Sequence, residues 1–155
     1  MKPSLKVRMV CNDPDLMPVY ATPGAAGMDL CCAQDAYIFP DQVTIIPTGI
    51  SLEIPDGYEA QVRPRSGLAA RDAITVLNSP GTIDSDYRGE IKVIVFKHGP
   101  KSLILKKGER IAQLVFAPVA KAELIRVKSL DETERGQQGL GSTGTRRLTK
   151  TVVNQ

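Results

Sequence analysis

Short apolar segments rich in valine and isoleucine recur along the chain, and glycine, proline, asparagine and aspartate separate them at intervals of about 8 to 12 residues. The 11 prolines and 13 glycines are spread through the 155 residues. Both residues disfavour long helices, because proline lacks an amide donor and glycine is costly to order. We therefore predict an all-β fold, a closed or sandwiched antiparallel sheet such as a jelly roll. The expected strands cover residues 5–10, 43–47, 50–55, 58–64, 91–96, 102–105 and 110–116.

One segment, residues 66–73 (SGLAARDA), has the composition of a short helix, with Ser66 as its expected N-cap. Composition changes near Asp131, where the chain becomes polar and rich in glycine. Such a stretch buries too little apolar surface to order itself. We expect a β domain over residues 1–130 and a mobile C-terminal arm over residues 131–155.

The overall composition fits a single domain located inside the cell. With 42% apolar residues, a chain of this length can build one core. The three cysteines, Cys11, Cys31 and Cys32, indicate neither a disulfide framework nor a metal site, which makes a reducing compartment the default. No stretch is long and apolar enough for a signal peptide or a membrane span. We expect a cytoplasmic protein, or a nuclear one if the source is eukaryotic.

Charge placement argues against a nucleic-acid-binding domain. The net charge is +3, but Arg146, Arg147 and Lys150 lie in the last eleven residues, which contain no acid. The rest of the chain is neutral, so a basic face would need balanced charges to be sorted in space. The basic tail is the one feature that favours a nucleic-acid partner.

The segment from Asn78 to Glu90 (NSPGTIDSDYRGE) combines two carboxylates and a tyrosine with glycines. On extended backbone, Asp84 and Asp86 would point to the same side, where like charges repel unless a cation or a water needs them. A solvated turn built from the same residue types is the alternative. The residues alone do not separate the two carboxylates as candidate catalysts.

Four further segments have the composition of sites. They are AAGMDL with Asp29, RPRSGL with Arg65, Ser66 and Gly67, GERIAQL with Gln113, and RGQQGLGSTG with Arg135. The forked guanidinium group of arginine and free backbone N–H groups can bind a phosphate. The backbone N–H groups of a glycine-rich stretch can surround an anion. Each also has a structural alternative: a carboxylate at a strand start, a capped turn, a solvent-facing amide and a flexible linker. His98 has no partner nearby in sequence and is expected in a turn.

In this order and spacing, the five segments resemble the five motifs of the trimeric dUTPases (deoxyuridine 5′-triphosphate nucleotidohydrolases), over about Val19 to Gly144. The resemblance implies a distorted jelly-roll-like subunit and a homotrimer whose three active sites are shared between subunits. It implies Mg²⁺-assisted hydrolysis of dUTP to dUMP and pyrophosphate. This reaction limits uracil incorporation into DNA and supplies dUMP for dTMP synthesis. No membrane or nucleic-acid partner is expected.

The same resemblance assigns roles to individual residues. Asp84 would be the general base that activates the attacking water, and Tyr87 would pack under the deoxyribose and exclude a 2′-hydroxyl. Mg²⁺ would be held by substrate phosphates and waters, with Asp29 touching it only through water and no direct protein ligand. Uracil would be bound by a hairpin carrying Asn78, Gly81, Thr82, Ile83 and Lys92. The phosphates would be bound by Arg65, Ser66, Gly67 and Gln113, and from a neighbouring arm by Arg135, Gly141, Ser142 and Thr143. Leu140 of the same arm would cover the uracil.

Leu140 departs from the motif, which commonly carries a phenylalanine that stacks on uracil, and eleven residues follow the motif where the arm often ends. Three other functions are alternatives to the dUTPase interpretation: a dCTP deaminase of the same fold, a non-catalytic nucleotide-sensing module, and a nucleic-acid binder. The complete third and fifth motifs weigh against the first. The presence of both Asp84 and Arg135 weighs against the second.

Overall fold

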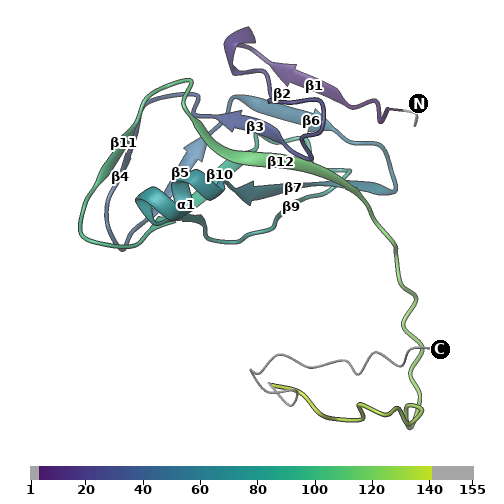
Figure 1. The fold of residues 1–155 in the computed structure, drawn as a ribbon. Helices are drawn as coiled ribbons and strands as arrows, with labels where there is room; N and C mark the ends of the chain where they lie inside the picture. The colour runs from purple at the N-terminus through teal and green to yellow at the C-terminus, as the bar shows by residue number, and fades with distance from the viewer. Residues whose placement is uncertain (1–3, 141–155) are drawn as a thin grey trace, which may run out of the picture. The chain divides into compact units, whose positions relative to one another are not determined.

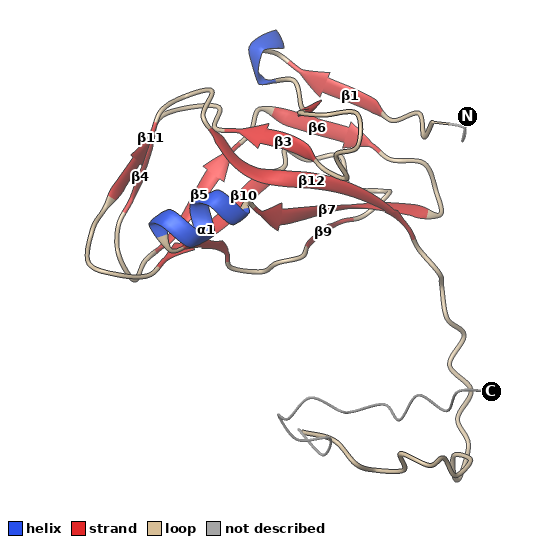
Figure 2. Cartoon of the chain, viewed as in Figure 1, coloured by secondary structure: helices blue, strands red, loops and turns tan. Residues whose placement is uncertain are grey.

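A computed structural model describes residues 4–140, and in this part of the chain it contains short strands and a single short α-helix (Figures 1 and 2). In chain order the elements are β1 (Arg8–Cys11), the 3-10 turn η1 (Pro14–Leu16), β2 (Val19–Tyr20), β3 (Met28–Cys31), β4 (Ala36–Ile38), β5 (Val43–Pro47), β6 (Ile50–Glu53), β7 (Tyr58–Pro64), α1 (Ser66–Asp72), β8 (Ile74–Val76), β9 (Gly81–Ile83), β10 (Lys92–Lys97), β11 (Leu103–Leu105) and β12 (Arg110–Pro118).

The strands form four small antiparallel sheets. Their orders are β1-β6, β5-β10-β8, β11-β4 and β2-β3-β12-β7-β9. The long strand β12 crosses the domain between β3 and β7 (Figure 1). The jelly-roll-like antiparallel fold expected from the sequence is confirmed, and its distortion consists of this division into several short ladders.

One apolar core lies between the sheets, because strand residues alternate between the two faces. In β10, Val93 and Val95 are buried while Ile94 is only partly so. In β12, Ile111, Ala112 and Leu114 are buried. The largest fully buried side chains include Leu30, Ile38, Ile46, Ile50, Ile91, Ile111 and Leu114.

Each of the seven expected strands overlaps an observed one, whereas β2, β3, β4, β8 and β9 are not among the seven. These five contain only two to four residues, too few for an alternating pattern to be recognised. The helix is confirmed, but the expectation that Ser66 is its N-cap is wrong. Arg65 has the capping position, because its carbonyl accepts the first helical bond from the Ala69 amide at 3.0 Å.

The chain divides into two units, Met1–Lys121 and Ala122–Gln155. In the described part of the second unit, turns surround Arg135: the Gly136 amide donates to the Thr133 carbonyl at 3.0 Å, and the Gln138 amide donates to the Arg135 carbonyl at 3.1 Å. Gly141, Ser142 and Thr143 lie outside the described residues. The expected boundary between a β domain over residues 1–130 and a mobile arm over residues 131–155 stays a prediction.

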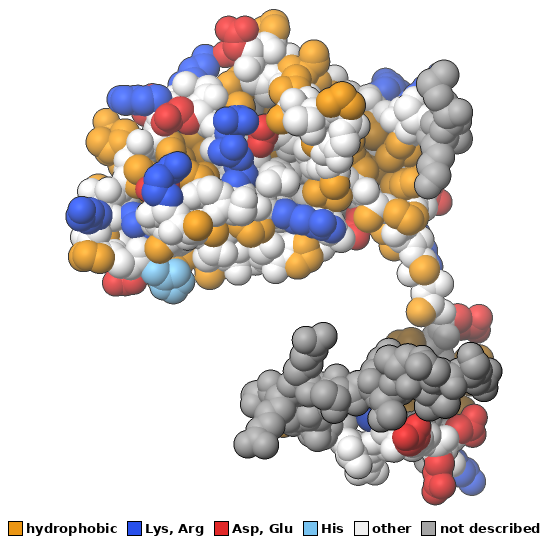
Figure 3. Space-filling model, in the orientation of Figure 1, with side chains coloured by type: hydrophobic (Ala, Val, Ile, Leu, Met, Phe, Trp, Pro, Cys, Tyr) orange, Lys and Arg blue, Asp and Glu red, His pale blue; other side chains and the backbone are white. Residues whose placement is uncertain are grey.

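Charged side chains of both signs are interspersed over the face of the first unit drawn in Figure 3. All three cysteines are free thiols. Within residues 4–140, no helix is long and apolar enough to cross a membrane.

Candidate active site

Strand order brings three of the candidate segments together on one sheet. Gln113 of β12 lies opposite Asp29 of β3 on one side and opposite Arg63 of β7 on the other. Arg65 follows directly after β7. Because β12 pairs with both strands, residues more than 80 positions apart in sequence become lateral neighbours.

A carboxylate between two guanidinium groups forms the centre of this cluster. Asp29 forms an ion pair with Arg65 Nε at 3.1 Å and accepts a hydrogen bond from Arg110 Nη1 at 3.0 Å, and its side chain is only 12% exposed. Arg65 also donates from Nη1 to the Arg110 carbonyl at 3.1 Å. These contacts hold the Arg65 fork in a defined orientation beside the start of α1. Arg110 was not identified as a site residue from the sequence, although it lies within the quoted segment GERIAQL.

Gln113 lies against a glycine that has no room for a side chain. A Cβ atom on Gly27 would come within 3.0 Å of Gln113 Oε1 and 3.1 Å of a Val115 methyl carbon. The glycine of AAGMDL therefore allows β12 and its amide to approach closely.

Replacement of Asp29 tests the energetic role of this cluster. We expect Asp29→Asn to lower the free energy of unfolding by about 1 to 3 kcal/mol, because two guanidiniums lose their common anionic acceptor. Chemical denaturation measures the change. Asp56→Asn is the matched control, since the Asp56 carboxylate is 89% exposed and lies 3.8 Å from Lys121. Equal decreases in the free energy of unfolding of the two variants would contradict the stabilising role of Asp29.

The segment from Asn78 to Glu90 adopts a conformation that separates its two carboxylates. β9 ends at Ile83, and the Tyr87 amide donates to the Asp84 carbonyl at 3.2 Å, which closes a turn. The expectation that Asp84 and Asp86 point to the same side is wrong, because it required extended backbone through Ser85. Asp84 lines a cleft of about 220 Å³. Asp86 lines a different pocket, together with Arg8 and Arg88.

Asp84 shares its cleft with Thr82, Tyr87, Glu90 and Lys92, and isoleucines form the rest of the wall. Ile45 of β5 lies opposite Ile94 of β10, and both contribute to this wall. Neither isoleucine was identified from the sequence, where both fit an ordinary strand pattern. The lining residues are Ile45, Thr82, Ile83, Asp84, Tyr87, Glu90, Ile91, Lys92 and Ile94.

The two ends of this segment belong to different sheets. β9 pairs with β7, whereas β10 pairs with β5 and β8. The expected hairpin from Asn78 to Lys92 is therefore a crossing between two sheets. Asn78 lies at its start and packs on Gly81, because a Cβ atom on that glycine would be 3.2 Å from Asn78 Nδ2.

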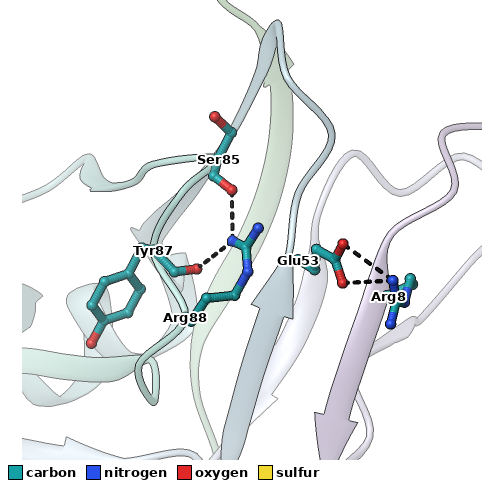
Figure 4. Close-up of polar contacts among 5 residues, drawn as sticks. All are labelled: Arg8, Glu53, Ser85, Tyr87 and Arg88. Atoms are coloured by element: carbon teal, nitrogen blue, oxygen red, sulfur yellow. Dashed lines mark hydrogen bonds and ion pairs between the residues drawn. The ribbon is translucent and has the colours of Figure 1, made fainter.

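Arg88 stabilises the turn through contacts with its main chain (Figure 4). Its Nη1 donates to the Ser85 carbonyl at 2.7 Å and to the Tyr87 carbonyl at 3.0 Å. The nearby Arg8 and Glu53 form a separate ion pair between β1 and β6, at 3.1 Å. Arg88 thus cross-links the main chain that carries Asp84 and Tyr87.

The environment of the two adjacent cysteines near Asp29 disfavours their thiolate forms. Burial, together with the negative charge of Asp29, raises the pKa of the Cys31 thiol above its ordinary value. Burial raises the pKa of Cys32 to about 12. These shifts are opposite to the lowered pKa that activates a nucleophilic cysteine.

The structure therefore forms two clusters in one chain: Asp29, Arg65 and Gln113 on the five-stranded sheet, and Asp84, Tyr87 and Lys92 around the cleft. No residue of the first cluster lines the cleft of the second within the described part of the chain. Ser66 and Gly67 form the first turn of α1. Arg135 and Leu140 belong to the second unit.

Comparisons with known proteins agree with the motifs. The dUTPase family model matches residues 14–144. The deoxyuridine 5′-triphosphate nucleotidohydrolase of Hydrogenobaculum sp. is 55% identical over 129 residues, which cover 83% of this chain and 90% of that protein. The corresponding protein of Nautilia profundicola is 54% identical over 140 residues, covering 90% and 98%.

A solved structure has the same fold. The dUTPase of Staphylococcus bacteriophage 80alpha, solved with dUPNHPP, superposes with a TM-score of 0.80 at 26% identity and covers 90% of this chain and 99% of the phage chain. The family model covers most of the chain, and two relatives exceed half identity over nearly their whole length. The chain belongs to the dUTPase family.

Proposed function

We propose that this protein hydrolyses dUTP to dUMP and pyrophosphate, by attack of water on the α-phosphorus with Asp84 as general base. The observation that carries the assignment is that Asp84 shares one cleft with Tyr87 and Lys92, whereas Asp86 lines another pocket. A general base must reach the water that it deprotonates. The product dUMP would feed dTMP synthesis, and removal of dUTP would limit uracil in DNA.

The phosphates are assigned to the cluster around Arg65. A triphosphate carries about four negative charges, which must be neutralised while the nucleophile is held in line. Arg65 is preoriented by Asp29, and the backbone N–H groups of Ser66 and Gly67 lie in the first turn of α1, where they have no helical partner. Gln113, on the adjacent strand, would contact the α-phosphate or the attacking water.

The nucleoside is assigned to the cleft. Backbone groups of Ile83 and Lys92, which line the cleft with Thr82, would bind uracil together with Gly81 and the Asn78 amide, which lie outside its wall. These hydrogen-bonding groups would reject cytosine, because its donor and acceptor positions are exchanged relative to those of uracil. They would reject thymine because its methyl group would collide with the wall of the cleft. The Tyr87 ring would fill the volume that a 2′-hydroxyl requires.

A homotrimer with shared active sites accounts for the separation of the two clusters. Phosphate-binding and nucleoside-binding residues lie apart in one chain, so a complete site is formed when the Arg65 cluster of one subunit meets the Asp84 cleft of another. The arm over residues 131–155 would then close over the γ-phosphate of a neighbouring site through Arg135, Gly141, Ser142 and Thr143, with Leu140 covering the uracil.

Mg²⁺ is assigned to the substrate phosphates and their waters, consistent with its reluctance to lose water. The ion would neutralise phosphate charge when bound. One Asp29 oxygen accepts a hydrogen bond from Arg110, the other forms an ion pair with Arg65, and both keep further lone-pair capacity. This donor set fits contact with the ion through water.

A substrate comparison tests the proposed function. The protein is incubated separately with dUTP, dCTP, dTTP and UTP, and pyrophosphate and the released nucleotide are identified. We expect dUMP and pyrophosphate from dUTP, with far slower reactions of the other three. Release of dUTP from dCTP would instead identify a deaminase, and no turnover of dUTP would refute the proposal.

Tyr87→Ala tests the steric gate. We expect the ratio of kcat/KM for dUTP over UTP to fall about tenfold or more, since the filled volume beneath the sugar opens. Discrimination against dCTP should change less, because base recognition lies elsewhere in the cleft. Tyr37→Ala, in an exposed tyrosine of β4 that does not line the cleft, is the control. An unchanged dUTP to UTP ratio would rule out this role for Tyr87.

A further inference from the structure

The Tyr87 ring is folded back over its own chain, against Gly89. A Cβ atom built on Gly89 would lie 2.5 Å from Tyr87 Cζ and closer still to the hydroxyl oxygen. The ring therefore occupies the space that any side chain at position 89 would need. Its hydroxyl donates to the main-chain carbonyl of Glu90 at 3.1 Å.

The carbonyl that receives this bond belongs to a peptide anchored elsewhere in the fold. The Glu90 carboxylate accepts from the Gly49 amide at 2.8 Å. The Ile91 amide donates to the Ile50 carbonyl at 2.8 Å. The Thr48 hydroxyl, which is fully buried, donates to the Ile91 carbonyl at 2.7 Å. Three hydrogen bonds thus join residues 90–91 to the turn between β5 and β6.

These three bonds are stronger anchors than the bond made by the tyrosine. A hydrogen bond to an ionised carboxylate is about twice as strong as a neutral one, and a buried hydroxyl without its partner is costly. The Tyr87 bond is neutral and exposed, so it contributes little by itself. The position of the ring consequently follows from where residues 90–91 are held.

We infer that Glu90 and Thr48 are positioning residues that set substrate specificity: through the 48–50 turn they fix the Glu90 carbonyl, and with it the Tyr87 ring. This inference rests on the proposed function only in assigning the ring to sugar discrimination. Glu90 also lines the cleft, whereas Thr48 is fully buried and does not, so the Thr48 variants test positioning without changing the cleft wall.

The test uses two pairs of variants in the full-length protein. Glu90→Ala removes the carboxylate anchor, and Glu90→Gln restores an oxygen acceptor. Thr48→Val removes the hydroxyl with little change in shape, and Thr48→Ser restores it. If Glu90→Ala does not fold, the threonine pair carries the test. Controls are Glu53→Ala, which removes an exposed carboxylate paired with Arg8, and Thr75→Val on β8.

The first readout is independent of activity. The chain contains four tyrosines and no tryptophan, so NMR of protein labelled on the tyrosine rings gives few signals, and Tyr87→Phe identifies that of Tyr87. We expect this signal to move in Glu90→Ala and Thr48→Val, and to return toward its original position in Glu90→Gln and Thr48→Ser. A Tyr87 signal that stays in place in both truncating variants would overturn the inference.

The second readout is the kcat/KM ratio for dUTP over UTP. We expect about a five- to tenfold decrease in Glu90→Ala, corresponding to the loss of one hydrogen bond, with the ratio recovered in Glu90→Gln and unchanged in the controls. An equal decrease in Glu53→Ala would overturn the inference. If Tyr87→Ala leaves the ratio unchanged, the proposed gate fails, while the NMR result still decides whether Glu90 and Thr48 position the ring.

Discussion

Asp84→Asn is expected to lower the turnover of dUTP by roughly 10² to 10⁴, the range for loss of a general base. The asparagine keeps the shape and hydrogen-bonding capacity of the side chain but does not accept the proton of the attacking water. Because Asp84 follows the end of β9, lines the cleft and is not part of the core cluster, the fold should persist. Single-turnover hydrolysis, measured beside binding of a non-hydrolysable analogue, separates chemistry from affinity.

The neighbouring carboxylate provides a matched control for this experiment. Asp86 is two residues away and has the same charge, yet it lines the pocket that contains Arg8 and Arg88. Asp86→Asn should therefore retain most of the turnover. Comparable losses in both variants would indicate an effect of net charge on the turn, and Asp84 would no longer be assigned as the base.

Removal of residues 135–155 is expected to lower turnover by at least about a hundredfold, the scale associated with loss of charge-stabilising donors at the reacting phosphates. This truncation deletes Arg135 and the complete fifth motif. It leaves the unit Met1–Lys121, which contains the apolar core. Activity assays and sedimentation compare the truncated protein with the full-length protein. We expect the truncated protein to retain the oligomeric state of the full-length one.

A second truncation distinguishes the motif from the tail. Removal of residues 145–155 deletes Arg146, Arg147 and Lys150 but keeps the motif, and we expect near-normal turnover. Normal hydrolysis by the shorter protein that lacks residues 135–155 would refute the closing role of the arm. Dissociation of that protein into monomers would show that the arm is structural.

Much of the fold could be predicted from local patterns. The segments 58–64 and 91–96 alternate or concentrate apolar residues over several positions, and they became β7 and β10. Strands β4 and β8 have three residues each, so burial against the rest of the domain defines them rather than their own pattern. The cap of α1 was misassigned by one residue, since Arg65 takes that position without a side-chain bond.

The family and the candidate site residues could likewise be predicted from the sequence. The candidate residues lie in five short motifs, and the order of glycines, carboxylates and arginines in these motifs is characteristic of the family. The motifs did not indicate which residues meet. The pairing of β3 and β7 with β12 brings Asp29 into contact with Arg65 and also with Arg110. This pairing depends on contacts between residues far apart in the chain.

Sequence by itself therefore determined the β-rich fold class and the chemical groups available for the reaction. The residues alone did not separate Asp84 from Asp86, and the family resemblance selected Asp84. Tertiary structure added that the two carboxylates line different pockets, because a turn lies at Ser85 and Asp86. It also brought the turn at Thr48 and Gly49 into hydrogen-bond contact with residues 90–91, about 42 positions away in sequence. The physical reason is that local propensity sets backbone conformation over a few residues, whereas side-chain neighbours are set by how the sheets pack.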